Sequence, residues 1–157
     1  MKGKDGWHLY NKILVPTDGS KGAASAIELA RDLLIGGVGK TVSLLNIASI
    51  AKEVTDYSII NTKRVDEELI KLKLMHQGQQ ILLPGKAIFK EAGLPVDTII
   101  ELYDNPGEMI IKIAENQNFD LIVMGSRGLS VVKELILGSV SSHVLRHAGC
   151  PVIIYRG

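Results

Sequence analysis

The amino-acid sequence predicts an α/β protein built around a parallel β-sheet. Five short apolar runs recur along its 157 residues, and segments of helical length lie between them. The runs are nearly continuous in apolar residues rather than alternating, which is typical of strands that helices cover on both faces. Because strand and helix alternate throughout the chain, right-handed crossovers between parallel strands are favoured.

Each apolar run defines one expected strand. The five are KILVP (12–16), TVSLLNI (41–47), VDTIIEL (96–102), DLIVMG (120–125) and PVIIY (151–155). Helical periodicity predicts helices over 20–35, from near 62 onward, over 106–117 and over 139–147.

The helical segments carry apolar stripes of the kind that pack on a sheet. Leu69 and Leu72 follow Val65 at the opening of the second expected helix, and we expect a kink or break where it meets Pro84, since an interior proline costs ~3 kcal/mol. The stripe of the first expected helix consists of Ala23, Ala24, Ile27, Ala30 and Leu34. That of the third consists of Ile110, Ile113 and Ala114.

The segment 49–61 (SIAKEVTDYSIIN) shows no clean period, and we expect a loop there. Tyr57, Ile59 and Ile60 could contact a ligand or a partner. The alternative is that this loop only covers the edge of the core.

Composition narrows the classes of function. Lys and Arg number 18 against 17 Asp and Glu, a net charge of +1, so neither nucleic acid nor an anionic membrane surface is an expected partner. Cys150 is the single cysteine, which excludes a disulfide framework and a cysteine-cluster zinc site and favours the cytoplasm. No apolar run approaches the ~20 residues of a spanning helix, and no targeting segment is evident. We expect one domain over 1–157.

The stretch GGVGKT (36–41) resembles a phosphate-binding P-loop. A P-loop follows a strand and opens a helix, whereas this stretch follows a helix and leads into a strand. Leu34 also stands where the P-loop pattern needs glycine. We therefore interpret Gly36 as a helix cap and Lys40 as a solvent-facing residue.

The loops after the first and fourth strands are the candidate ligand site, because doubly wound sheets bind ligands at the carboxyl ends of their strands. These loops are PTDGS (16–20) and residues 125–142. Gly125 and Gly128 lack a Cβ, so backbone there can approach a ligand closely. Gly138 and Ser139 stand where a helix begins, with Ser139 as a candidate N-cap. The N–H groups and hydroxyls of that first turn offer a seat for an anion; two ordinary turns with a serine cap are the alternative.

Gly125, Gly128, Gly138 and Ser139 match G-x2-G-x9-G-[ST], the ATP-binding signature of the universal stress protein family. The chain resembles this family over nearly its whole length, through KILVPTDGS, VSLLNI, DLIVMGSRGLS and GSVSSHVLRHAGCPVIIYR. The resemblance implies an open five-stranded parallel sheet in the order 3-2-1-4-5 with helices on both faces, Rossmann-like and similar to the adenine-nucleotide alpha-hydrolases. Residues 1–11 have no counterpart and form an N-terminal extension.

The resemblance also implies roles for individual residues. Asp18 would contact the ribose, although a turn or cap aspartate is the alternative, and Pro16 and Thr17 would shape the pocket floor. The backbone of Ile47 would meet the adenine, and Met124 would line the pocket beside it. The ribose and phosphate contacts would come from Gly125, Gly128, Gly138, Ser139, Val140 and Ser141.

The ligand implied by the family is ATP, or AMP or ADP as a bound product, with Mg²⁺ or Mn²⁺ held by the phosphates rather than by the protein. No catalytic base is evident. Arg127 could reach a phosphate or be solvated, and His143 and His147 lack a third metal ligand. We expect a nucleotide-dependent regulator in the stress response with at most slow hydrolysis; the alternatives are a phosphoryl- or adenylyl-transfer enzyme and a nucleotide-free dimeric scaffold.

A homodimer is expected through the last strand. Proline is tolerated on an edge strand, as at Pro151, and a bare apolar edge invites pairing. The strand edges would pair antiparallel through Val152, Ile153, Ile154 and Tyr155.

Overall fold

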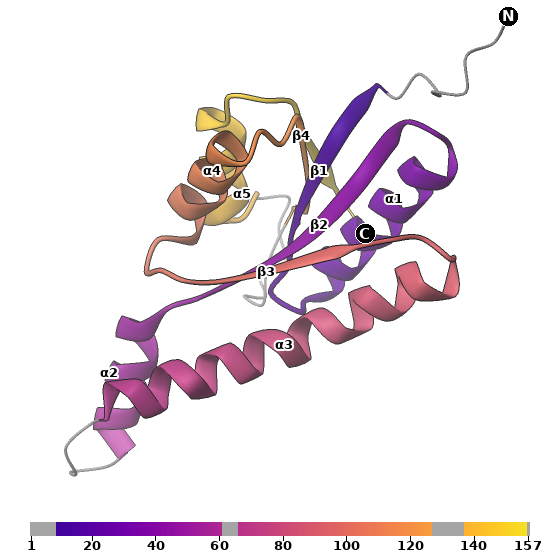
Figure 1. The fold of residues 1–157 in the computed structure, drawn as a ribbon. Coiled ribbons are helices and arrows are strands. Elements are labelled where there is room, and N and C mark those ends of the chain that lie inside the picture. Colours follow the sequence, from indigo (N-terminus) through magenta and orange to yellow (C-terminus); the bar gives the residue numbers. More distant parts are fainter. Residues whose placement is uncertain (1–8, 61–65, 127–136, 157) are drawn as a thin grey trace, which may run out of the picture.

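The computed structural model describes residues 9–60, 66–126 and 137–156. These residues form a five-stranded parallel sheet in the order β3-β2-β1-β4-β5 (Figure 1). The parallel sheet and the strand order expected from the sequence are both confirmed. The strands are β1 (Tyr10–Pro16), β2 (Gly39–Ala48), β3 (Asp97–Leu102), β4 (Leu121–Gly125) and β5 (Val152–Tyr155).

The strand β1 lies at the centre of the sheet, between β2 and β4. Ile13 pairs with Val42 on one side and with Leu121 on the other. Next to this pairing, the Asp120 carboxylate accepts hydrogen bonds from the backbone N–H groups of Asn11 (2.8 Å) and Lys12 (2.9 Å). Burial is the largest single influence on the pKa of Asp120 and raises it. The hydrogen bonds together outweigh burial, so the pKa of Asp120 is lowered. The carboxylate thereby fastens the start of β1 to the start of β4.

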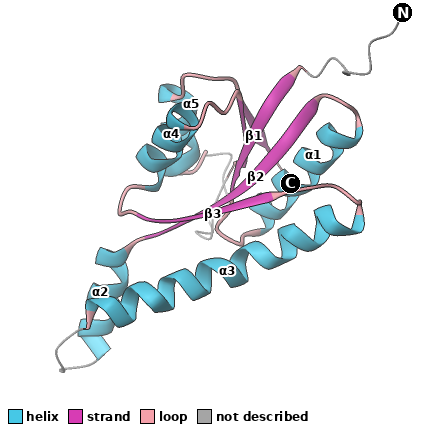
Figure 2. Ribbon diagram, in the orientation of Figure 1, coloured by secondary structure: helices cyan, strands magenta, loops and turns pink. Residues whose placement is uncertain are grey.

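Helices cover both faces of the sheet (Figures 1 and 2). The helices α1 (Lys21–Ile35) and α3 (Glu67–Glu91) lie on one face, and α4 (Pro106–Asn116) and α5 (Ser139–His147) lie on the other. Side chains alternate along β1, so Ile13 and Val15 enter the core under α1 and α3 while Leu14 enters the other core. This burial on both faces explains the continuous apolar runs.

The helix α1 ends as the sequence predicts. Gly36 is its C-cap, and Gly37 takes a φ of 71°, a left-handed conformation that glycine adopts at little cost. β2 then begins at Gly39, and Lys40 is exposed. GGVGKT is thus a cap and a turn. The buried stripe of α1 differs from the prediction at two positions: Ala26 is buried, and Ala24 is exposed.

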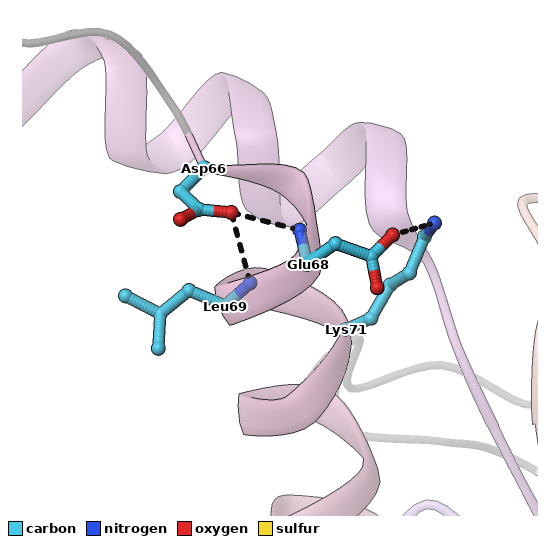
Figure 3. Close-up of polar contacts among 4 residues, drawn as sticks. All are labelled: Asp66, Glu68, Leu69 and Lys71. Carbon is cyan, nitrogen blue, oxygen red and sulfur yellow. Dashed lines mark hydrogen bonds and ion pairs between the residues drawn. The ribbon is translucent and has the colours of Figure 1, made fainter.

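The helix α3 begins at Glu67, later than the predicted start near 62. Asp66 is its N-cap, and the carboxylate accepts from the N–H groups of Glu68 (3.1 Å) and Leu69 (3.3 Å), as Figure 3 shows. Leu69 and Leu72 are 62% and 68% exposed, because this end of α3 extends past the sheet (Figure 1). The buried side of α3 consists of Ile70, Leu74, Gly78, Leu82, Gly85 and Phe89.

Of the kink or break predicted at Pro84, the break is wrong, since α3 continues through this residue as one helix (Figure 1). Pro84 lies on the exposed side of the helix, so the carbonyl group that loses its N–H partner can face water. Gly85 and Leu82 keep the opposite side packed on the sheet; a Cβ on Gly85 would lie 2.6 Å from Cδ1 of Leu44. No helix in the described ranges is long and apolar enough to cross a membrane.

The segment predicted as a loop, 49–61, contains the helix α2 (Ile50–Ile60). Contacts distant in sequence stabilise it: the Asp104 carboxylate accepts from the Ser49 hydroxyl (2.8 Å) and from the Ala51 N–H (3.1 Å), and Glu53 pairs with Lys73 of α3. These tertiary contacts therefore stabilise a helix in a segment whose sequence lacks helical periodicity. The possible contacts of Tyr57, Ile59 and Ile60 lie outside the described side chains.

Candidate functional site

The loop after β1 is a tight turn that leads directly into α1. Gly19 has a φ of 80°, a left-handed conformation that suits glycine. Its N–H donates to Oγ1 of Thr17 (3.3 Å), and the N–H of Ser20 donates to the Asp18 carboxylate (3.0 Å). The turn role anticipated for Asp18 is therefore real. It also holds Thr17 and Asp18 at the carboxyl edge of the sheet.

Gly125, the last residue of β4, has a structural reason to be glycine in addition to the predicted ligand contact. A Cβ at this position would lie 2.6 Å from the backbone carbon of Gly22 and 3.0 Å from the nitrogen of Ala23. The first turn of α1 therefore packs directly on the end of β4. The missing side chain allows helix and strand to approach, which brings the loop after β1 next to the end of β4.

The start of α5 corrects one detail, the predicted N-cap at Ser139. Gly138 is the N-cap, in an extended conformation without a side-chain capping bond, and Ser139 is the first helical residue. The Ser141 hydroxyl, which is buried, lies 2.9 Å from the carbonyl oxygen of Ser126 and 3.0 Å from that of Gly138. This hydroxyl ties the helix to the segment after β4. Among the hydroxyls of the first turn, Ser139 is the exposed one.

These segments surround a cavity of about 280 Å³ at the carboxyl ends of β1 and β4, which we call the edge cavity. All the predicted site residues line it except Gly128, which lies outside the described residues, as does Arg127. The predicted residues around the cavity are Pro16, Thr17, Asp18, Ile47, Met124, Gly125, Gly138, Ser139, Val140 and Ser141.

Four further residues complete the lining, and sequence reasoning missed them: Ala23, Leu45, Pro106 and Ile110. A signal existed for Pro106, which follows the carboxyl end of β3 and so obeys the rule that selected the other loops. Ile110 lies on the predicted apolar face of α4. Together these side chains make one wall of the cavity apolar.

The starts of three helices meet at the edge cavity, since Ala23 of α1, Pro106 of α4 and Ser139 of α5 all line it. Side chains cap two of them: Ser20 accepts from the Ala23 N–H (3.2 Å), and Asn105 accepts from the Glu108 N–H (3.3 Å). The third, α5, has only the glycine cap.

The first turn of α5 therefore presents backbone donors. No residue in the described ranges accepts from the N–H groups of Ser139, Val140 or Ser141. Such groups, at the positive end of a helix dipole, form a seat for an anion. The edge cavity thus combines an apolar wall, the Asp18 carboxylate and a helical turn whose backbone N–H groups have no acceptor among the described residues.

The sequence model of the Universal stress protein family matches residues 9–156. The chain belongs to the universal stress protein family. A universal stress protein of Bacillus subtilis is 35% identical over 155 residues, which cover 94% of this chain and 100% of the relative.

Solved structures of other universal stress proteins share the fold. One from Methanocaldococcus jannaschii superposes with a TM-score of 0.76 at 30% identity and covers 95% of this chain and 97% of its own. Another, from Arabidopsis thaliana and with AMP bound, has a TM-score of 0.63 at 18% identity and covers 93% of this chain and 91% of its own. The order of strands in this universal stress protein is thus the order of a family fold.

The pair His143 and His147 and the single cysteine of this universal stress protein do not line the edge cavity. The rings of His143 and His147 stack 4.4 Å apart, and Nδ1 of His147 lies 2.8 Å from the carbonyl oxygen of His143. No cluster of three metal-ligating side chains exists within the described ranges. Burial raises the pKa of Cys150, which makes its thiol a poor nucleophile at neutral pH.

Proposed function

We propose that this protein binds ATP, or its products ADP and AMP, in the edge cavity. The observation that carries the proposal is the start of α5, where no described residue accepts from the N–H groups of Ser139, Val140 and Ser141, and where these three residues line a cavity whose other wall is apolar. A nucleotide needs both features, because its base is flat and largely apolar and its phosphates are anions.

The parts of the nucleotide can be assigned to parts of the cavity. Ile47 and Met124 form the wall for the adenine, and Asp18 accepts from the ribose hydroxyls. The phosphates then extend to the start of α5, where Ser139 adds an exposed hydroxyl. The Arabidopsis structure with AMP bound supports a nucleotide in this fold.

We propose a regulator rather than a dedicated enzyme, acting in the cytoplasm in response to stress. Mg²⁺ or Mn²⁺ would be held by the phosphate oxygens and would neutralise their charge. The described residues around the cavity bind and orient the nucleotide, and none of them is assigned as a general base, so hydrolysis should be slow. The nucleotide state would then persist long enough to be sensed by a partner.

Two measurements on the wild-type protein test this function. Mass spectrometry of protein purified without added nucleotide should detect an adenine nucleotide. Calorimetric titration of nucleotide-free protein with ATP and Mg²⁺ should give saturable binding at one site per chain. If no nucleotide co-purifies and ATP at millimolar concentration gives no heat of binding, the proposed function is wrong.

We also propose a homodimer through the outer edge of β5. Toward β4, the Pro151 carbonyl accepts from Ile122 (3.0 Å) and the Tyr155 carbonyl accepts from Ser126 (2.9 Å). Backbone groups alternate in direction along a strand, so those of Val152 and Ile154 are directed to the outer edge. An antiparallel copy of β5 could pair with them.

Replacing Ile154 with proline should convert the dimer to a monomer, since proline removes the outward N–H donor and leaves the pairing with β4 intact. Sedimentation velocity at micromolar concentration measures the change. Ile154→Ala is the matched control, because it loses the same core side chain but keeps the N–H group and should remain dimeric. A wild-type protein that sediments as a monomer contradicts the dimer outright.

A further inference from the structure

Asn46 places a polar side chain inside the sheet core. It lies on β2, is 3% exposed, and belongs to the side of the strand that carries Val42 and Leu44 under α1 and α3. An amide in such surroundings must form hydrogen bonds to offset its loss of water, whereas leucine, of nearly the same shape, would have no such need. The hydrogen bonds of Asn46 therefore indicate why this position is polar.

The main contact of Asn46 is with the loop that lines the edge cavity. Its Nδ2 donates to the carbonyl oxygen of Thr17 (2.9 Å), while the N–H of Thr17 donates to the carbonyl oxygen of Leu45 (2.8 Å). Two consecutive residues of β2 thus hold both backbone groups of Thr17. Asn46 does not itself line the cavity, but Thr17 and the adjacent Asp18 do.

The helix α3 supports this arrangement from behind. A Cβ on Gly78 would lie 3.0 Å from Oδ1 of Asn46, so the helix backbone lies directly against the amide. One turn later, Ile81 reaches the same loop, since a Cβ on Gly19 would lie 3.6 Å from its Cγ2. The loop is therefore supported by α3 at two points, once through Asn46 and once directly.

We infer that Asn46 is a positioning residue, which holds the loop 16–20 in the shape that the edge cavity requires, with Gly78 fixing the orientation of its amide. Without the amide, the buried Thr17 carbonyl loses its partner, and the loop must shift for this group to find another. Asp18 would shift with it. The effect on ligand affinity rests on the proposed function, but the effect on the loop does not.

The substitution Asn46→Leu tests the inference with two readouts. Calorimetric titration with ATP should show an affinity about fivefold weaker than that of the wild type. Hydrogen exchange should be faster by about tenfold at the amides of Thr17, Gly19 and Ser20, each of which donates a hydrogen bond within or from the loop. A residue that only stabilised the whole fold would change neither readout well below the unfolding temperature.

Ser43→Ala is the matched control, because Ser43 is also a buried polar residue of β2 but pairs with Asp97 far from the loop. It should leave affinity and loop exchange at wild-type values. Gly78→Ala is the second variant, and serves if Asn46→Leu does not fold. Its methyl group displaces the amide while alanine favours the helix, so both readouts should change in the same direction as for Asn46→Leu.

The outcomes separate the two proposals. Wild-type affinity and unchanged loop exchange in Asn46→Leu, or in Gly78→Ala if that variant alone folds, would overturn the inference and leave the proposed function standing. A wild-type protein that does not bind ATP, in combination with faster loop exchange in the variant, would remove the proposed function and support the role of Asn46 in the loop.

Discussion

Replacing Gly125 with alanine is expected to lower the midpoint of thermal unfolding by about 6–12 °C, from a loss of about 3 kcal/mol in the free energy of unfolding. The new Cβ would lie 2.6 Å from the backbone carbon and 2.7 Å from the oxygen of Gly22. A side chain could rotate away from such a contact, but these atoms belong to the first turn of α1. The helix as a whole must therefore move off β4.

Differential scanning calorimetry measures this effect, and Gly149→Ala is its control. A Cβ on Gly149 would only meet Oε1 of Glu115 at 3.6 Å, an ordinary contact, and the residue is exposed. The control should stay within about 0.5 kcal/mol of the wild type. Equal unfolding midpoints for the two variants would show that α1 and β4 are not in backbone contact.

The substitution Ser139→Glu is expected to weaken ATP binding by about a hundredfold or more without loss of stability. A glutamate in the first turn of a helix interacts favourably with the dipole, by about 0.3–1 kcal/mol, so α5 should form at least as well. In the edge cavity its carboxylate would compete for the N–H groups of Val140 and Ser141 and would repel the phosphates. Ser139→Ala, which only removes the hydroxyl, should cost about tenfold.

Lys40→Glu is the control for charge. It introduces the same acid at an exposed site at the start of β2, at the opposite end of the strand from Ile47, and should change ATP affinity by no more than about twofold. Calorimetric titration of the three variants decides between the sites. If Lys40→Glu abolishes binding while Ser139→Glu retains it, the nucleotide lies at the GGVGKT stretch and the assignment to the edge cavity is wrong.

Sequence reasoning succeeded where one local property determines the structure. Burial on both faces gives the strands an unmistakable apolar signal, and the rule for carboxyl ends then selects the loops around Asp18 and Ser139. The position of GGVGKT after a helix and before a strand likewise distinguishes a cap and turn from a P-loop. Order along the chain was enough for these conclusions.

The remaining features depend on contacts between distant residues. The start of α2 needs Asp104, which is 55 residues from its partner Ser49, and no local pattern announces that bond. Pro84 is tolerated because it lies on the exposed side of α3, which periodicity alone did not show. Gly125 lines the edge cavity as the sequence predicts, but its close packing against Gly22 has no signal in the sequence. The hydrogen bond from Asn46 to Thr17 likewise joins residues that are distant in the sequence, so the sequence alone did not predict it.

The central place of β1 also determines when the fold can be completed during synthesis. β1, β2 and β3 leave the ribosome first and can pair, but the second neighbour of β1 is β4, and Ile13 must wait for Leu121. Until then, the central strand of the finished sheet remains an open edge, exposed to pairing with other nascent chains. The parallel order that creates the edge cavity therefore also makes the emerging chain dependent on protection until its last third has been made.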